Sequence, residues 1–65
     1  MNRYTVTCVY RRSNGLDYNF PTDRTEVIVE AETPEAARAA AIDMVYQQAY
    51  CEISHVRPSR VVLVT

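Results

Sequence analysis

Residues Thr25–Val45 read TEVIVEAETPEAARAAAIDMV, and this stretch decides the fold of the chain. In its first part Val27, Val29 and Ala31 recur at every second position, which is the period of a β-strand with one buried side. In its second part the apolar residues recur every three or four positions, which is the period of an amphipathic α-helix. The stretch therefore predicts a strand that leads directly into a helix.

The predicted helix has a well-defined start. Thr33 is a favourable N-cap, Pro34 takes the first helical position, where its missing N–H costs nothing, and Glu35 complements the positive end of the helix dipole. We expect the helix to run from Pro34 to about Tyr50. The residues expected to face the sheet are spaced by four and are Ala37, Ala41 and Val45.

A first strand is predicted at Arg3–Arg12, because apolar and polar residues alternate along it. One of its faces carries Tyr4, Val6, Cys8 and Tyr10. Asn14-Gly15 follows, and this pair is the strongest short signal for a hairpin turn. Residues 13–23 allow two interpretations, a long second strand with a bulge at Pro21 or a loop. In both, the tip of the hairpin carries Leu16, Tyr18 and Phe20.

A third strand is predicted by the apolar run Arg60–Thr65, and Pro58 places its start near Ser59 or Arg60. The element order is then β-β-α-β. Because crossover connections are right-handed, the third strand should lie beside the first, in strand order 2-1-3 with the helix on one face. We therefore expect an α+β fold with a mainly antiparallel three-stranded sheet, formed by a single domain over residues 1–65.

Size and composition limit the possible functions. A chain of 65 residues buries only about 60% of its unfolded surface, so its core is thin. A net charge of −1 argues against binding to nucleic acid or membrane through overall charge. Neither a leader nor a long apolar span is evident, so a cytoplasmic location is expected, in a bacterium or a phage-infected cell. Cys8 and Cys51 should then be reduced, buried side chains.

The sequence gives little support for catalysis. His55 is the only histidine, and the Cys51–His55 pair lacks an evident carboxylate or asparagine partner. Cys8, Cys51 and His55 do not supply a fourth metal ligand, and a single glycine cannot build a phosphate-binding loop. We expect no enzyme activity, no metal and no cofactor, with His55 in a loop.

The predicted sheet has one uncovered face and an exposed third strand. One helix covers one face only, so the other face should present an apolar patch made of Val9, Ile28, Val62 and Val64. The unpaired edge of the third strand is a second place where another chain could pair. Both features predict a homodimer, through the open face or through that edge; the alternative is a small exposed patch that Thr5, Thr7 and Pro58 make less apolar.

Arginines should gather at one end of the sheet, near the hairpin tip. The expected partner-binding residues are Arg11, Arg12, Tyr18, Phe20, Arg57 and Arg60. Arginine and tyrosine are enriched at protein-binding hot spots, which favours a protein partner. Arginines beside aromatic rings also suit nucleic acid, and the alternative is that they form salt bridges with Asp17 and Asp23.

All seven basic residues are arginine, and the chain contains a Val-x-Val-x-Ala-x-Thr-Pro-Glu-Ala-Ala joint over residues 27–37. In these features it resembles small single-domain proteins from phages and prophages of high-GC bacteria. The sequence thus predicts a non-enzymatic, homodimeric protein-binding module, and the resemblance implies action on a host protein. The alternatives are a nucleic-acid-binding protein and a structural subunit of a larger assembly such as a virion.

Overall fold

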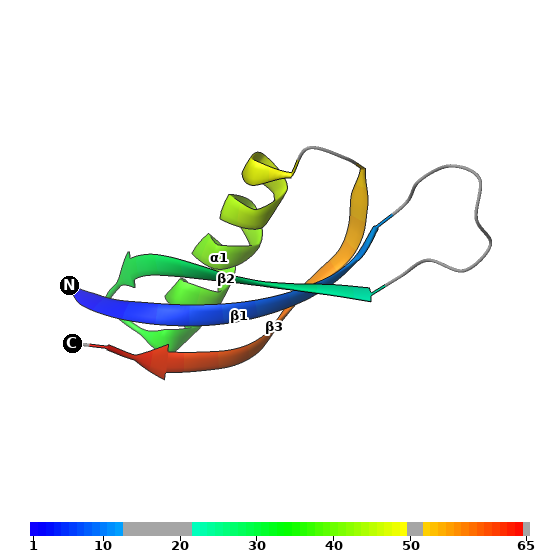
Figure 1. Ribbon diagram of the computed structural model, residues 1–65. Helices are drawn as coiled ribbons and strands as arrows, with labels where there is room; N and C mark the ends of the chain where they lie inside the picture. Colours follow the sequence, from blue (N-terminus) through cyan, green and yellow to red (C-terminus); the bar gives the residue numbers. More distant parts are fainter. Residues whose placement is uncertain (13–21, 50–51, 65) are drawn as a thin grey trace.

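The computed structural model describes residues 1–12, 22–49 and 52–64. The elements are β1 (Asn2–Arg12), β2 (Thr22–Ala31), α1 (Pro34–Gln48) and β3 (Ile53–Leu63). β1 is the central strand and runs antiparallel to both neighbours, in the order β2-β1-β3, while α1 crosses one face of the sheet (Figure 1). The predicted α+β fold, with this strand order and a helix packed on the sheet, is confirmed. Across these ranges, no helix has both the length and the apolar character needed to cross a membrane.

The two interpretations of residues 13–23, a bulged strand or a loop, fall mostly outside the described residues. The Asn14-Gly15 turn and Pro21 lie outside the described residues. β2 begins at Thr22, and its register with β1 is continuous from Arg11–Thr22 to Asn2–Ala31.

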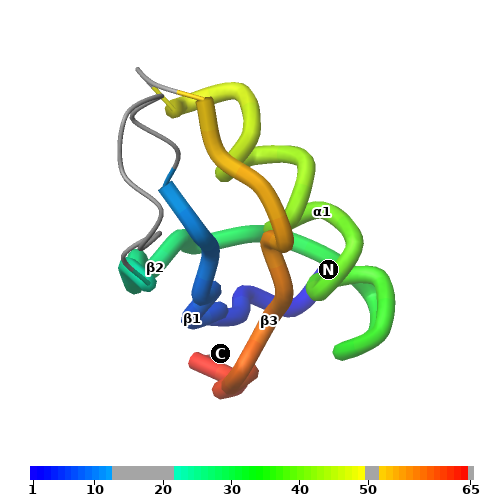
Figure 2. Tube along the Cα trace, turned by 90° about the vertical axis from the view of Figure 1, so that its right-hand side faces the viewer, coloured from blue at the N-terminus to red at the C-terminus, as the bar shows by residue number. Residues whose placement is uncertain are grey.

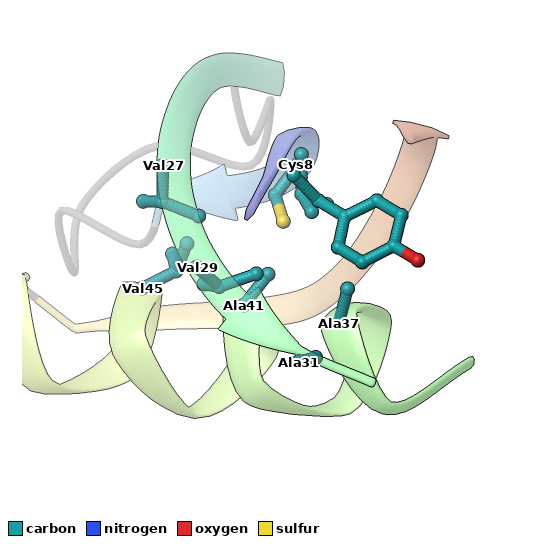
Figure 3. Close-up of a cluster of buried hydrophobic side chains, with 9 residues drawn as sticks. Cys8, Val27, Val29, Ala31, Ala37, Ala41 and Val45 are labelled. Carbon is teal, nitrogen blue, oxygen red and sulfur yellow. The ribbon is translucent and has the colours of Figure 1, made fainter. Parts of the chain in front are cut away.

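The hydrophobic core lies between the sheet and α1 (Figure 3). Its buried side chains alternate along the strands and recur every four residues along the helix, as the sequence predicts. They are Tyr4, Val6, Cys8, Val27, Val29, Ala31, Ala37, Ala41 and Val45. Ala37 and Ala41 have no exposed surface, because their small side chains let the helix backbone approach the strands closely. β3 adds partly buried side chains at the border of the core, from Ile53, Val56 and Val61.

The helix starts as predicted and ends slightly earlier. Thr33 is extended (φ −134°, ψ 158°), and its Oγ1 accepts a hydrogen bond from the Ala36 N–H at 3.1 Å. α1 ends at Gln48 rather than near Tyr50, because Ala49 turns to an extended conformation (φ −72°, ψ 133°) that directs the chain toward β3.

β3 is longer than the sequence analysis predicts. The prediction that it starts near Ser59 or Arg60 is wrong, since the strand begins at Ile53 and includes Pro58. β3 is an edge strand, where proline is tolerated.

Two irregularities divide β3. Cys8 pairs with Pro58 while Thr7 pairs with Arg60, so Ser59 is an extra residue, and its Oγ donates a hydrogen bond to the Thr7 carbonyl at 3.2 Å. A second register shift lies further along, where β3 has one residue more than β1. Such bulges bend a strand, and β3 curves visibly between its orange and red halves (Figure 1).

Candidate binding surface on the open sheet face

The sheet has one face that α1 does not cover. Figures 1 and 2 show the helix on one side of the three strands. Strand alternation and register then place the remaining side chains on the opposite face, in rows that run across β2, β1 and β3. Successive rows are Ile28–Thr5–Val62, Glu26–Thr7–Arg60 and Arg24–Val9–Arg57.

The first of these rows is apolar, and we call Ile28, Thr5 and Val62 the apolar row. Ile28 is 61% exposed and Val62 is 41% exposed, although both are large apolar side chains. The Val64 N–H donates a hydrogen bond to the Arg3 carbonyl at 2.8 Å, which extends the pairing of β1 and β3 beyond Leu63. Val64 therefore continues the same face as Val62, and its side chain is 50% exposed. Together with Val9, the four residues predicted for an oligomer interface thus lie on the same open face.

Charged residues border the apolar row on both sides. Arg3 and Glu30 lie beyond it toward the chain ends, with Nη2 and Oε1 3.5 Å apart. Glu26 and Arg60 lie on its other side, opposite Thr7 on the two flanking strands. An apolar strip with a charged border is the usual composition of a protein-binding surface.

The other half of the open face is rich in arginine. We call Arg11, Arg24, Arg57 and Arg60 the arginine half. Arg24 and Arg57 flank Val9 from the two neighbouring strands, and Arg60 lies opposite Thr7. All four side chains are exposed, and none has an acidic partner among the described residues. Their guanidinium groups are therefore available to an external ligand.

Arg12 does not belong to this group. It follows Tyr10 by two positions and pairs with Ile53, which packs against the core, so it lies on the helix side of the sheet. Its guanidinium forms an ion pair with the carboxylate of Asp23. For this residue the structure therefore supports the salt-bridge interpretation. Leu16, Asp17, Tyr18 and Phe20 lie outside the described residues, as does Cys51, whose predicted burial is therefore a prediction still.

A shallow depression of about 340 Å³ opens beside the arginine half. Its described lining is made of Val9, Tyr10, Arg11, Thr22, His55, Val56 and Arg57. The arginines supply positive charge at the rim, while the two valines supply apolar surface. This combination can hold a side chain with an aliphatic stem and an anionic end.

His55 is the residue whose position sequence reasoning missed. The prediction that it lies in a loop is wrong, because it lies within β3, at the second register shift. There His55 and Val56 together stand opposite Tyr10, and His55 takes a positive φ of 55°. Its Nδ1 lies 3.0 Å from the Ser54 Oγ. The bulge brings its side chain to the depression, and nothing in the sequence near His55, such as a glycine, signals it.

The described part of the chain groups no set of metal ligands, and its cysteine is buried. Within ranges 1–12, 22–49 and 52–64, no three histidine, cysteine or acidic residues are grouped to hold a metal ion. Cys8 has no exposed surface, and burial raises the pKa of its thiol. The reactive thiolate is therefore disfavoured at this position, and Cys8 acts as a packing residue.

Comparison of the chain with protein-family models, with curated proteins and with solved structures found no match in any of the three. Small α+β folds carry many unrelated functions, so the fold alone does not specify one. The chemistry of the open face is therefore the basis for a functional proposal.

Proposed function

We propose that this chain is a small, non-enzymatic protein-binding module that forms a homodimer through its open sheet face. The observation that carries the proposal is the exposure of Ile28, Val62 and Val64 on a face that the helix leaves uncovered. A domain of 65 residues has a thin core, and a second copy would remove this apolar surface from water.

The open face is a better candidate for the dimer interface than the edge of β3. Pairing along an edge requires a regular row of free N–H and C=O groups. Pro58 lacks the N–H, and the extra residues near Ser59 and His55 shift the register twice. The β3 edge is therefore interrupted along much of its length.

The opposite charges of Glu26 and Arg60 favour one dimer arrangement, although the same arrangement also brings Arg24 of one copy toward Arg57 of the other. A two-fold axis along β1 lays β2 of one copy over β3 of the other, so that Ile28 faces Val62 and Glu26 faces Arg60, twice by symmetry. An axis across the strands at the apolar row instead sets Glu26 against Glu30. Packed sheets keep their strands within about 30° of each other, a condition that both arrangements meet, so the facing charges decide between them.

Measurement of mass in solution tests the dimer. We expect the wild-type chain to have twice its 7.4 kDa mass by light scattering or sedimentation, and Val62→Glu to be monomeric with an unchanged circular dichroism spectrum. Ala39→Glu, an equal charge change at an exposed helix position, should remain dimeric. A monomeric wild type overturns the proposal. So does a Val62→Glu variant that stays dimeric, because a dimer paired through a strand edge would tolerate this substitution.

A charge exchange tests the arrangement itself. Glu26→Arg alone and Arg60→Glu alone should each weaken the dimer, because each places like charges across the interface. The double variant restores opposite charges, so its dissociation constant should return toward the wild-type value. Failure of the double variant to recover contradicts the axis along β1.

A further inference from the structure

We infer that the arginine half binds an acidic segment of a protein partner, with an aspartate or glutamate side chain entering the depression between Arg11 and Arg57. This inference names the partner of the proposed module, so it rests on the proposed function. It does not require dimerisation, because Arg11, Arg57 and the rest of the described lining of the depression come from a single chain.

The first argument is that the arginines at the depression have no acidic partner among the described residues. Arg11 and Arg57 line the depression, and neither has an acidic partner in the described part of the chain. A guanidinium group presents a planar fork of donors that matches a carboxylate, with two parallel hydrogen bonds. Arg24 lies in the same row as Arg57, on the other side of Val9, so a second acidic residue of the segment would also find a partner, while Arg60 faces Glu26 of the other copy in the proposed dimer.

The second argument is the shape and lining of the depression. Its volume of about 340 Å³ exceeds what one carboxylate side chain fills, and its valines offer apolar contact to a methylene stem. The bulge at His55 sets one wall, since the positive φ of 55° redirects the backbone there. Residues held in such conformations occur often at functional sites.

The third argument favours a protein over a nucleic acid. Binding of single strands relies on aromatic rings on which the bases stack. The described residues do not form such a platform, because Tyr10 contributes to the lining of the depression but packs against the core, and Tyr4 is buried on the opposite side of β1.

The proposed dimer strengthens this inference. With the two-fold axis along β1, Arg24 of one copy approaches Arg57 of the other, so positive charge from both copies collects at the same end. Like charges across an interface are unfavourable. An acidic segment bound at that end would neutralise them, which predicts that the peptide stabilises the dimer.

Fluorescence anisotropy with a labelled decapeptide of alternating glutamate and aspartate tests the inference at low and physiological salt. We expect saturable binding by the wild type, none by the matching glutamine and asparagine peptide, and binding weakened at least about tenfold by Arg57→Glu or Arg11→Glu. Arg38→Glu is the matched control, because Arg38 is exposed on α1, and it should bind within about twofold of the wild type.

Three results would overturn the inference: no binding of the acidic peptide at low salt, equal loss of binding in Arg38→Glu, or tighter binding of a single-stranded oligonucleotide of the same charge. Masses measured on the same samples separate this inference from the dimer. If monomeric Val62→Glu binds the peptide, the inference is supported whether or not the wild type is a dimer. If the wild type is a dimer that does not bind the peptide, the inference is refuted and the dimer proposal is unaffected.

Discussion

Replacement of Ala41 by leucine tests the close packing between helix and sheet on which the fold depends. Ala41 has no exposed surface and lies in the row of α1 that faces the strands. Leucine adds three carbon atoms where there is no free space, and overpacking of this kind costs about 1–3 kcal/mol. Alanine and leucine have similar helix propensities, so the helix itself should be little affected.

The expected loss is a large part of the total stability. At roughly 0.05–0.15 kcal/mol per residue, a chain of 65 residues has a free energy of unfolding of about 3–10 kcal/mol. A loss of about 2 kcal/mol lowers the melting temperature of such a small domain by roughly 8–16 °C. Circular dichroism during thermal and urea unfolding measures the effect, at one fixed protein concentration because dimerisation would also shift the transition.

Ala39→Leu provides the matched control. Ala39 is exposed on the same helix, so the same substitution there should change the free energy of unfolding by no more than about 0.5 kcal/mol. If Ala41→Leu and Ala39→Leu unfold alike, the helix does not rest on the sheet through this row, and the reasoning about the core is refuted.

Other predictions concern the helix cap, the buried thiol and the bulge. Thr33→Ala removes the acceptor for the Ala36 N–H and should lower the free energy of unfolding, measured in urea, by about 1 kcal/mol. Thr33→Ser keeps a hydroxyl acceptor and should retain most of the wild-type stability. Burial raises the pKa of Cys8 above its ordinary 9.0, so the unfolded chain loses this proton first, and stability should fall above about pH 9 more steeply in the wild type than in Cys8→Ala. In Cys51→Ser, labelling of the remaining Cys8 thiol should be slow until the protein is unfolded; rapid labelling of the native protein contradicts its burial. His55→Gly should leave the melting temperature nearly unchanged, while His55→Val should lower stability by about 1–2 kcal/mol, because a β-branched residue tolerates positive φ poorly; equal stability of the two variants contradicts the bulge geometry.

Much of the fold follows from local patterns in the sequence. Near Thr33 the spacing of the apolar residues changes from two to three or four, and Thr33 and Pro34 are favourable residues for a helix start. These signals predict where β2 ends and α1 begins. The strand order then follows from the handedness of crossover connections. These features are predictable because each depends on neighbouring residues or on a rule that applies to any chain.

The differences between the predicted and the observed structure have identifiable physical causes. Pro58 suggested a late start for β3, yet the predicted strand order already made β3 an edge, where proline interrupts little. Alternation along β1 likewise separates Arg11 from Arg12, so the sequence itself could have assigned Arg12 to the helix side. The bulge at His55 could not be predicted, because it depends on how β3 pairs with β1 far away in the sequence and not on a turn-forming residue.

The adjacency of the two chain ends determines how the domain responds to mechanical force. Tyr4 pairs with Leu63, and the ladder extends to the hydrogen bond between Val64 and Arg3, so both ends leave the sheet at the same corner (Figure 1). Tension applied between them opens the β1–β3 ladder one bond at a time, like a zipper, instead of shearing many bonds together. Since β1 is the central strand, such peeling exposes the core early, and the domain should yield at low force when pulled by its two ends.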